Sequence, residues 1–461
     1  SDAGKAWAEF HAFTSAALPR VATCSSEAAA TLEAAIAFPD GADFTTPGVA
    51  PDGLVAGGYG AVKAAFESVY ECLGITCAEV GGYNDAMPAC ADESTIHDKT
   101  WYYDGLEGLV AVDNGYQGPI VGYQPASDVL EHNKIDLDVQ SLAQLWNADD
   151  YAGAYAVYKN GKHSAKGDGK RTLKGFSKPL DGEATYEEYF AYHNSNTSGH
   201  DYVLAAVCAF LPGEADCASA PSTFESHGVG LGDEAAYQMF VKAVQYQHSW
   251  LYSTHELYSA LDKCDAGLNL PSQAPHAWDE GWAFYVGSVS GTDGVAPSED
   301  GQLTYRMADK RCADMGTCLN DKVASWRSAF DLSYRASDPT KFVSLSNVNA
   351  KLLALYRAGL EAVHDASRCR EAATYVEQIV AQMTVPLIQG AIKYAEKADP
   401  ASGKATATDH GKAYAEFHAF TTAALPRVAQ CDAAAGMALE NALALPAGAD
   451  FTPNPPADEL Q

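Results

Sequence analysis

The chain has no long apolar run and few basic residues. No apolar stretch among its 461 residues approaches the roughly 20 residues that a membrane-spanning helix needs, so direct membrane insertion is not expected. Its 30 lysines and arginines are outnumbered by 60 aspartates and glutamates, which gives a formal net charge of −30 at pH 7. Such an acidic surface repels nucleic acid and attracts cations, although it also serves solubility in a salty medium. Nucleic acid is therefore excluded as a partner, whereas a metal ion is not.

Three signatures of enzyme chemistry are missing as well. There is no Gly-x-Ser-x-Gly elbow for a nucleophilic serine, and no phosphate-binding glycine loop followed by lysine. A zinc peptidase needs a second histidine four residues after the first. His255 and Glu256 begin such a motif, but the position four residues after His255 is occupied by Ser259. These absences argue against a serine hydrolase, a nucleotide-binding loop and a zinc peptidase, and the chain is not expected to be an enzyme.

The eleven cysteines do not follow metal-binding spacings, because neither a zinc ribbon nor a Cys-x-x-Cys pair occurs. In this chain they predict disulfide bonds and an oxidising, extracellular compartment. Cys208 with Cys217, and Cys312 with Cys318, are close enough in sequence for local bridges. The sequon that begins at Asn196 lies in a polar loop, and it predicts a glycosylation site in a secreted protein.

The two ends of the chain carry a repeat. Residues 4–24 return as residues 411–431 with only three differences. We interpret the organisation as a helical metal-binding unit at 1–400, a linker at 401–410 and a partial second copy at 411–461. The cysteines of the first unit form an even set, and the remaining one, Cys431, is equivalent to Cys24. This pattern favours a tandem protein that is cut short over a single body in which the two copies pack together.

Hydrophobic periodicity predicts a mostly α-helical, disulfide-stapled bundle with long loops. Apolar positions recur at helical spacing in four long segments, which are residues 126–158, 233–262, 347–365 and 370–398. Residues 97–123 are rich in glycine and aromatics without a clear period, which is compatible with short strands, and residues 288–320 are expected to form a loop. The polar segment 159–181 has hardly any apolar residues, so it marks the expected boundary between two lobes.

The segment 275–285 is expected to open a helix, and it reads PHAWDEGWAFY. At 100° per residue its two tryptophans fall on one side, whereas His276 and Glu280 share the opposite side. One face can therefore pack into a core while the other binds a ligand. The adjacent carboxylates of Asp279 and Glu280 have a second explanation, because a helix start favours negative groups through its dipole.

The helix expected over residues 233–262 carries polar groups on its apolar face. His248, His255 and Asp262 are spaced seven residues apart, so they align along that face. Burying such groups costs roughly 2–7 kcal/mol unless each has a partner, which is water, another side chain or a metal ion. A core histidine with ordinary hydrogen bonds is the simpler explanation for any one of them, but the occurrence of several favours a metal site.

The candidate metal ligands are His193, His248, His255, Glu256, Asp262, His276, Asp279 and Glu280. Mixed imidazole and carboxylate ligands suit iron, or another divalent metal such as manganese or zinc, better than copper(I), which prefers sulfur. The sequence therefore predicts a metal ion, with iron favoured, as the bound species.

Two motifs resemble a known family. The repeated AEFHAF-x-x-AALPRVA segment and the run HAWDEGWAFYVGS are similar to the secreted iron-assimilating proteins of green algae, which are induced by iron deficiency or high carbon dioxide. The resemblance implies a periplasmic or cell-wall location, extracellular binding of Fe3+ or Fe2+ rather than catalysis, and a membrane iron transporter or reductase as partner. The alternatives are a secreted metal-dependent hydrolase that uses the same groups and a non-catalytic carbohydrate-binding protein of the cell wall.

Overall fold

The computed structural model describes residues 25–36, 74–83, 120–177, 213–219, 240–288, 301–318 and 346–398, with scattered residues within 63–70, at 90, within 203–211 and at 237. Over these residues the protein is mostly helical, and the one sheet is a two-stranded hairpin. This confirms the predicted fold class. Among the described residues, no helix combines the length and the apolar character needed to cross a membrane.

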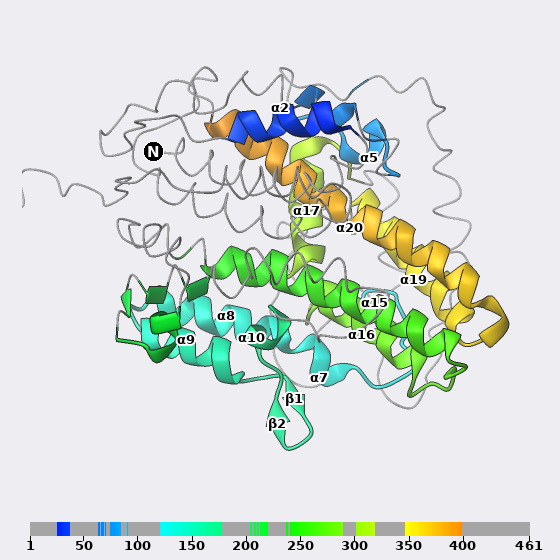
Figure 1. Ribbon diagram of the computed structural model, residues 1–461, viewed down its shortest axis with the longest axis horizontal. Coiled ribbons are helices and arrows are strands. Elements are labelled where there is room, and N and C mark those ends of the chain that lie inside the picture. Colours follow the sequence, from blue (N-terminus) through cyan, green and yellow to red (C-terminus); the bar gives the residue numbers. More distant parts are fainter. Residues whose placement is uncertain are drawn as a thin grey trace, which may run out of the picture.

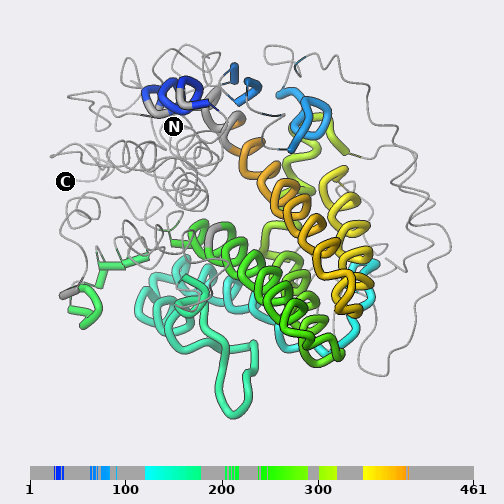
Figure 2. Tube along the Cα trace, turned by 45° about the vertical axis from the view of Figure 1, so that its right-hand side comes forward, coloured from blue at the N-terminus to red at the C-terminus, as the bar shows by residue number. Residues whose placement is uncertain are grey.

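Four long helices pack together as two helical hairpins (Figure 1). The first hairpin consists of α15 (Ser249–Asp265) and α16 (Ala274–Val286), and the second of α19 (Asn347–Val363), the short η4 (Ala366–Arg368) and α20 (Cys369–Ala398). Figure 2 shows α19 and α20 running side by side. The disulfide Cys264–Cys369 joins the turn regions of the two hairpins, and there Asn269 donates a hydrogen bond from Nδ2 to the carbonyl of Val363 at 2.8 Å.

The second hairpin matches the sequence prediction closely. Ser346 caps α19, because its hydroxyl accepts the backbone N–H of Asn349 at 3.1 Å, and this cap explains why the helix begins there. The predicted apolar stripe of α19, represented by Leu352 and Tyr356, is buried against the bundle. The bounds expected from periodicity, 347–365 and 370–398, agree with the observed ones within two residues.

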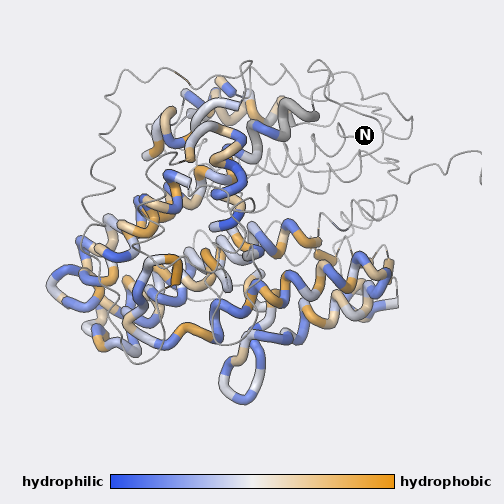
Figure 3. Tube along the Cα trace, turned by 180° about the vertical axis from the view of Figure 1, so that it is seen from behind, coloured by the Kyte–Doolittle hydropathy of each residue, from blue (hydrophilic) through white to orange (hydrophobic). Residues whose placement is uncertain are grey.

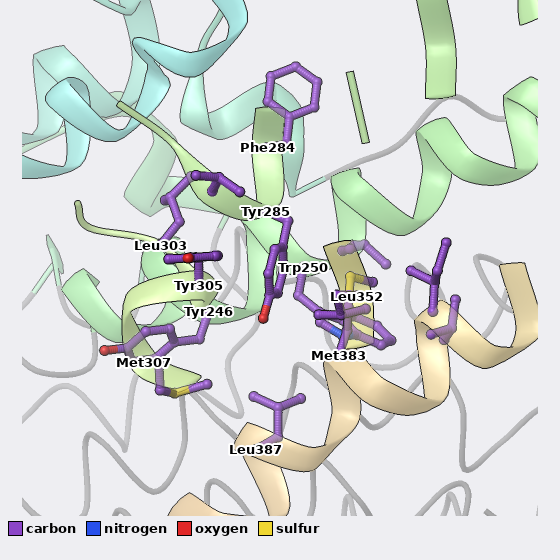
Figure 4. Close-up of a cluster of buried hydrophobic side chains, with 14 of the residues drawn as sticks. Tyr246, Trp250, Phe284, Tyr285, Leu303, Tyr305, Met307, Leu352, Met383 and Leu387 are labelled. Atoms are coloured by element: carbon purple, nitrogen blue, oxygen red, sulfur yellow. The ribbon is translucent and has the colours of Figure 1, made fainter. Parts of the chain in front are cut away.

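The buried face of α16 is aromatic. Trp278 and Trp282 are fully buried, and their indole N–H groups donate to the carbonyls of Tyr356 at 2.8 Å and Ile120 at 2.9 Å. Neither ring therefore leaves a buried polar group unpaired. Tyr285 points from the same helix into the hydrophobic cluster drawn in Figure 4. This packing fixes the rotation of α16 about its axis, so the side that carries its polar residues is turned away from the tryptophans.

A group of short helices lies beside the first hairpin (Figure 1). It consists of α7 (Leu130–Asn133), α8 (Ile135–Trp146), α9 (Tyr151–Asn160) and α10 (Leu173–Phe176). Helix α7 contacts α16, and α10 contacts α15. Between α9 and α10, strands β1 (Ala165–Lys166) and β2 (Gly169–Lys170) form an antiparallel hairpin that projects from the body and is mostly hydrophilic (Figure 3). The described part of the segment expected to be a lobe boundary thus contains this hairpin and α10.

Two expected elements differ in the structure. The long helix expected over residues 233–262 contains a π-helical stretch, η2 (Ala243–His248), which leads directly into α15. The prediction of a loop over residues 288–320 is wrong for the second half of this segment, where the chain forms α17 (Thr304–Met315). Its apolar side chains, including Tyr305 and Met307, are buried, but the many charged residues between them obscure the helical period in the sequence.

Disulfides hold several of these elements together. The described residues contain Cys77–Cys90, Cys208–Cys217, Cys264–Cys369 and Cys312–Cys318. The two local bridges predicted from spacing, at 208–217 and 312–318, are confirmed. The remaining described elements are α2 (Ser26–Ile36), α5 (Cys77–Val80) and η1 (Ala215–Ser219). The terminal repeat, Cys24 and Cys431 lie outside the described residues.

Candidate metal centre

Helix α16 turns His276 and Glu280 to the same side, as their spacing of four residues predicts. Pro275 is tolerated in the first turn because the first N–H groups of a helix have no internal partner. Nε2 of His276 lies 3.4 Å from Oε1 of Glu280. Since the tryptophans hold the other side of the helix in the core, this pair is free to meet side chains from other elements.

Helix α7 supplies a third ligand group. Nε2 of His132 contacts Oε1 of Glu280 directly, and the rings of His132 and His276 stand nearly perpendicular, with centroids 5.4 Å apart. One ligand atom from each of these three residues lies within 4.8 Å of the other two, and within the described part of the chain this is the one group of its kind. Two imidazoles and one carboxylate form a donor set that binds non-haem Fe2+ and leaves coordination positions open.

Two further ionisable side chains border the group. Glu256 of α15 is buried, and it makes a hydrogen bond with Glu280. Arg171, between β2 and α10, contacts Nε2 of His132 and lies 3.7 Å from Oε1 of Glu280. Glu256 can supply another carboxylate ligand, whereas the guanidinium of Arg171 has no lone pair to offer a cation.

A buried chain of hydrogen bonds through Ser127 and Asp279 orients His276. Nδ1 of His276 lies 2.8 Å from the hydroxyl of Ser127. That hydroxyl donates to Oδ2 of Asp279 at 2.7 Å, and the hydroxyl of Tyr123 donates to Oδ1 of the same carboxylate at 2.6 Å. Because Ser127 uses its one proton on Asp279, we assign the proton of His276 to Nδ1. In the neutral ring Nε2 then has no proton, as a metal-binding histidine requires, and a carboxylate supports the ring through the serine.

Burial and hydrogen bonding set the charges of the site. Burial alone would raise the pKa of Glu280, but hydrogen bonds from His132 and His276 bring this pKa well below its ordinary value, so the carboxylate is ionised. Burial lowers the pKa of His132 below its ordinary 6.5, which favours the neutral imidazole. Burial raises the pKa of Asp279 to about 7. A charged Glu280 beside neutral imidazoles is the state in which these side chains can bind a cation.

The contacts around Glu280 place competing demands on the imidazole nitrogens. In the neutral ring with its proton on Nδ1, Nε2 of His276 would present its lone pair to Oε1 of Glu280. Nε2 of His132 would have to donate to Glu280 and accept from Arg171, and one imidazole nitrogen cannot do both. A cation among the three ligand atoms would convert the opposed lone pairs into ligand bonds.

The group is accessible to a small ion. The side chain of His276 is 29% exposed, whereas those of Glu280 and His132 are 15% and 7% exposed. An ion can thus enter past His276 and be held on a largely buried carboxylate, where electrostatic attraction is stronger than in water.

Residues 109–320 of the chain match the family model described as low iron-inducible periplasmic protein. The match confirms the family resemblance and the periplasmic localisation inferred from the sequence. No curated protein and no solved structure matches the chain. The matched segment contains every residue of the candidate centre, which are His132, Arg171, Glu256, His276 and Glu280.

Within the matched segment, three of the ligands proposed from the sequence come together. His276 and Glu280 share one side of α16, and Glu256 reaches Glu280 from α15. Asp279, adjacent in sequence, is directed to Ser127 instead and supports His276 from behind. Of these two neighbouring carboxylates, Glu280 is therefore a candidate ligand and Asp279 is a group that orients His276.

The other proposed ligands do not join this group. His248, His255 and Asp262 are distributed along η2 and α15. The ring of His248 lies 6.0 Å from that of Tyr158, and the ring of His255 lies 5.1 Å from that of Tyr252. Among the described residues, none of the three belongs to the set of ligand atoms within 4.8 Å. His193 and the sequon at Asn196 lie outside the described residues.

Sequence reasoning missed two members of the centre, His132 and Arg171. His132 belongs to a helix of only four residues, which is too short to show a periodic pattern. Arg171 lies in the polar segment that suggested a lobe boundary. Nothing in the spacing along the chain connects either residue with α16, because their approach depends on how α7 and the β1–β2 hairpin pack.

Proposed function

We propose that the protein binds an iron ion through His132, His276 and Glu280, with Glu256 as an additional carboxylate, and that this binding serves iron assimilation in the periplasmic space. The supporting observation is the approach of the three ligand atoms to within 4.8 Å of one another. The family description, low iron-inducible, favours iron among the metals that accept this donor set. The net charge of −30 would raise the local concentration of cations around the molecule.

The donor set also suits a carrier that releases its ion. Three or four protein ligands leave coordination positions open, and the exposed side of His276 gives a second molecule access to them. A membrane iron transporter or a reductase could therefore take the ion directly from the site. Reduction would favour transfer from a carboxylate-containing site, because Fe2+ attracts oxygen anions less strongly than Fe3+ does.

The contacts of Ser127, His276 and Asp279 do not favour hydrolysis. In a nucleophilic triad the histidine accepts the serine proton, and the acid orients the histidine. Here Asp279 accepts the serine proton itself. The tryptophans of the described residues are also fully buried, so they are not available to stack on carbohydrate. These contacts argue against a nucleophilic serine and against carbohydrate binding by the described tryptophans, whereas a metal-dependent hydrolase would use the same metal site.

Anaerobic titration with Fe2+, followed by elemental analysis, tests the proposal. We expect the unaltered protein to bind iron stoichiometrically, and His132→Ala and Glu280→Gln to weaken binding at least about tenfold, or ~1.4 kcal/mol. His163→Ala is the matched control, because His163 pairs with Ser141 at 3.0 Å and is not part of the group. Unchanged affinity in the His132 and Glu280 variants would reject the site.

A further variant distinguishes this site from one centred on the long helix. His255→Gln should retain most of the iron affinity, since His255 lies outside the group within 4.8 Å. Loss of binding in this variant, with full binding by His132→Ala, would instead place the iron along α15.

A further inference from the structure

The β1–β2 hairpin and the residues that flank it carry a concentration of positive charge. Residues 159–174 contain six of the chain's 30 lysines and arginines and only one acidic residue, Asp168. The segment is therefore basic, in a chain whose formal net charge is −30. The hairpin is mostly hydrophilic and projects from the helices (Figure 3), so its charges are presented away from the body.

Three lysines of this segment are exposed and form no ion pair with any described carboxylate. They are Lys162, Lys166 and Lys170, which we call the hairpin lysines. The other two lysines of the segment, in contrast, pair with Asp216 of η1 at 3.1 and 3.2 Å. The pKa of His163 is lowered first by burial and then by the charges of Lys162 and Lys170, so these two charges act on the same ring. The hairpin lysines therefore form a basic patch.

The base of the hairpin is fixed to α7 and α8. Glu131 of α7 accepts the hydroxyl of Ser164 on its carbonyl at 2.6 Å and the backbone N–H of Ala165 on Oε2 at 2.9 Å. The carboxylate of Asp138 in α8 accepts the backbone N–H groups of residues 162 and 163 at 3.0 and 2.7 Å. These contacts hold the hairpin in one orientation, beside the ligand group that α7 supplies.

The register of the hairpin places its lysines on both faces. Lys166 is paired with Gly169, and Lys170 is paired with Ala165. Directly opposed residues share a face, and side chains alternate between faces along a strand, so Lys166 and Lys170 project from opposite faces. A partner that contacts both lysines must pass around the hairpin, which an extended segment can do and a flat surface cannot.

An acceptor of iron has the wrong charge to approach most of this protein. Iron sites in proteins use carboxylates among their ligands, so a protein that receives iron carries negative charge where the ion enters. Two surfaces of the same sign repel each other. A local group of positive charges reverses this repulsion and determines where the two proteins meet.

Building on the proposed iron site, we propose that the hairpin lysines dock a carboxylate-rich, extended segment of the protein that receives the iron. The position of the hairpin suits this role, because Lys170 directly precedes Arg171, whose Nη2 lies 3.7 Å from Oε1 of Glu280. A segment held on the hairpin therefore lies beside the candidate metal centre, and the ion has a short path to it.

A competing explanation assigns the lysines a purely protective role. Lysines on exposed strands prevent the edges of two hairpins from pairing with each other. In that case their removal should cause self-association, measured by size-exclusion chromatography, and should leave the affinity for an acidic peptide no lower than in a variant that loses two lysines elsewhere.

The experiment measures the binding of a fluorescein-labelled dodecapeptide of aspartate and glutamate to the full, iron-free chain by fluorescence anisotropy. At about 0.01 M salt charges act over about 30 Å, so binding should be strongest there and weaken at about 0.15 M. We expect Lys166→Gln/Lys170→Gln to weaken peptide binding about tenfold, because two charge contacts are lost. Its iron affinity should remain that of the unaltered protein, since neither lysine belongs to the ligand group.

Lys263→Gln/Lys310→Gln is the matched control, because it removes the same charge from α15 and α17. Its affinity for the peptide should stay within about twofold of that of the unaltered protein. Carbodiimide coupling of peptide carboxylates to lysine amines, followed by peptide mapping, should place the cross-links on the hairpin lysines. Coupling uses the unaltered chain, so its result does not depend on the folding of any variant.

Equal peptide affinity in the two double variants, or cross-links confined to other lysines, would overturn the docking proposal and leave the iron site in place. Polygalacturonate at the same carboxylate concentration should bind no more tightly than the peptide. Binding of this polymer to the hairpin lysines at least about tenfold more tightly would make an anionic polysaccharide the occupant and overturn the protein partner. Absence of iron binding by the unaltered protein would overturn both proposals.

Discussion

The ring of Trp278 lies directly against the backbone of Gly359. A Cβ atom on Gly359 would come within 1.9 Å of Cζ2 of Trp278, so α16 and α19 touch here without room for a side chain. The indole N–H of Trp278 donates to Tyr356, one turn earlier on α19. This close contact sets the rotation of α16, and thereby the direction in which His276 and Glu280 point.

Replacement of Gly359 by alanine should destabilise the protein. The added methyl must displace the buried indole of Trp278, and overpacking of this kind costs typically about 1–3 kcal/mol. We expect a loss of at least this size in the free energy of unfolding, measured by denaturant titration. Gly213→Ala provides the control, since no atom lies within 4 Å of the position of its Cβ. Equal stability of the two variants would contradict the tight contact.

Removal of the hydroxyl of Ser127 should weaken iron binding without removing a ligand. Ser127→Ala leaves Nδ1 of His276 without its partner at 2.8 Å, so the ring and its tautomer are no longer fixed. We expect the dissociation constant for Fe2+ to rise about 10–100-fold, as for other groups that support metal ligands. Ser127→Thr keeps the hydroxyl and should restore most of the affinity. Equal losses in both variants would indicate a packing effect instead.

Iron affinity should decrease as the pH falls. Protons compete with iron for His132, whose pKa is lowered by burial below 6.5, so its share of the affinity is complete above that pH and declines below its pKa. The lowered pKa of Glu280 keeps the carboxylate ionised through the same range. Titrations with Fe2+ between about pH 5 and 8 should show this decline, with a shallower slope in His132→Ala. Affinity that rises toward pH 5 would be inconsistent with imidazole ligands.

The disulfide between the hairpins should stabilise the fold more than a local one. Cys264 and Cys369 are 105 residues apart in sequence, whereas Cys312 and Cys318 are separated by 6. Loop-closure entropy gives about 5 kcal/mol for the long connection and about 2 kcal/mol for the short one. Paired Cys→Ala replacements, compared by denaturant unfolding, should show the larger loss for the 264–369 bridge. Similar losses for both pairs would argue against an entropic origin.

The helices that the sequence predicts correctly are those whose own residues show the apolar period of a helix. The stripe of α19 and the two faces of α16 follow from the 3.6-residue period, and the local bridge Cys208–Cys217 follows from its short spacing. Helix α17 was missed because charged residues interrupt its apolar positions. The π-helical turn η2 has no periodic signature of its own.

The sequence by itself determined the helical class, the oxidised cysteines, the acidic surface and the separation of the tryptophans from His276 and Glu280 on α16. These properties depend on composition and on residues at most a few turns apart. Only the tertiary structure decided that His132 and Arg171 meet Glu280, that Glu256 is the residue of α15 that reaches it, and that Asp279 acts through Ser127. The physical reason is that a ligand set assembled from separate elements depends on how those elements pack, and packing joins residues whose separation along the chain carries no pattern.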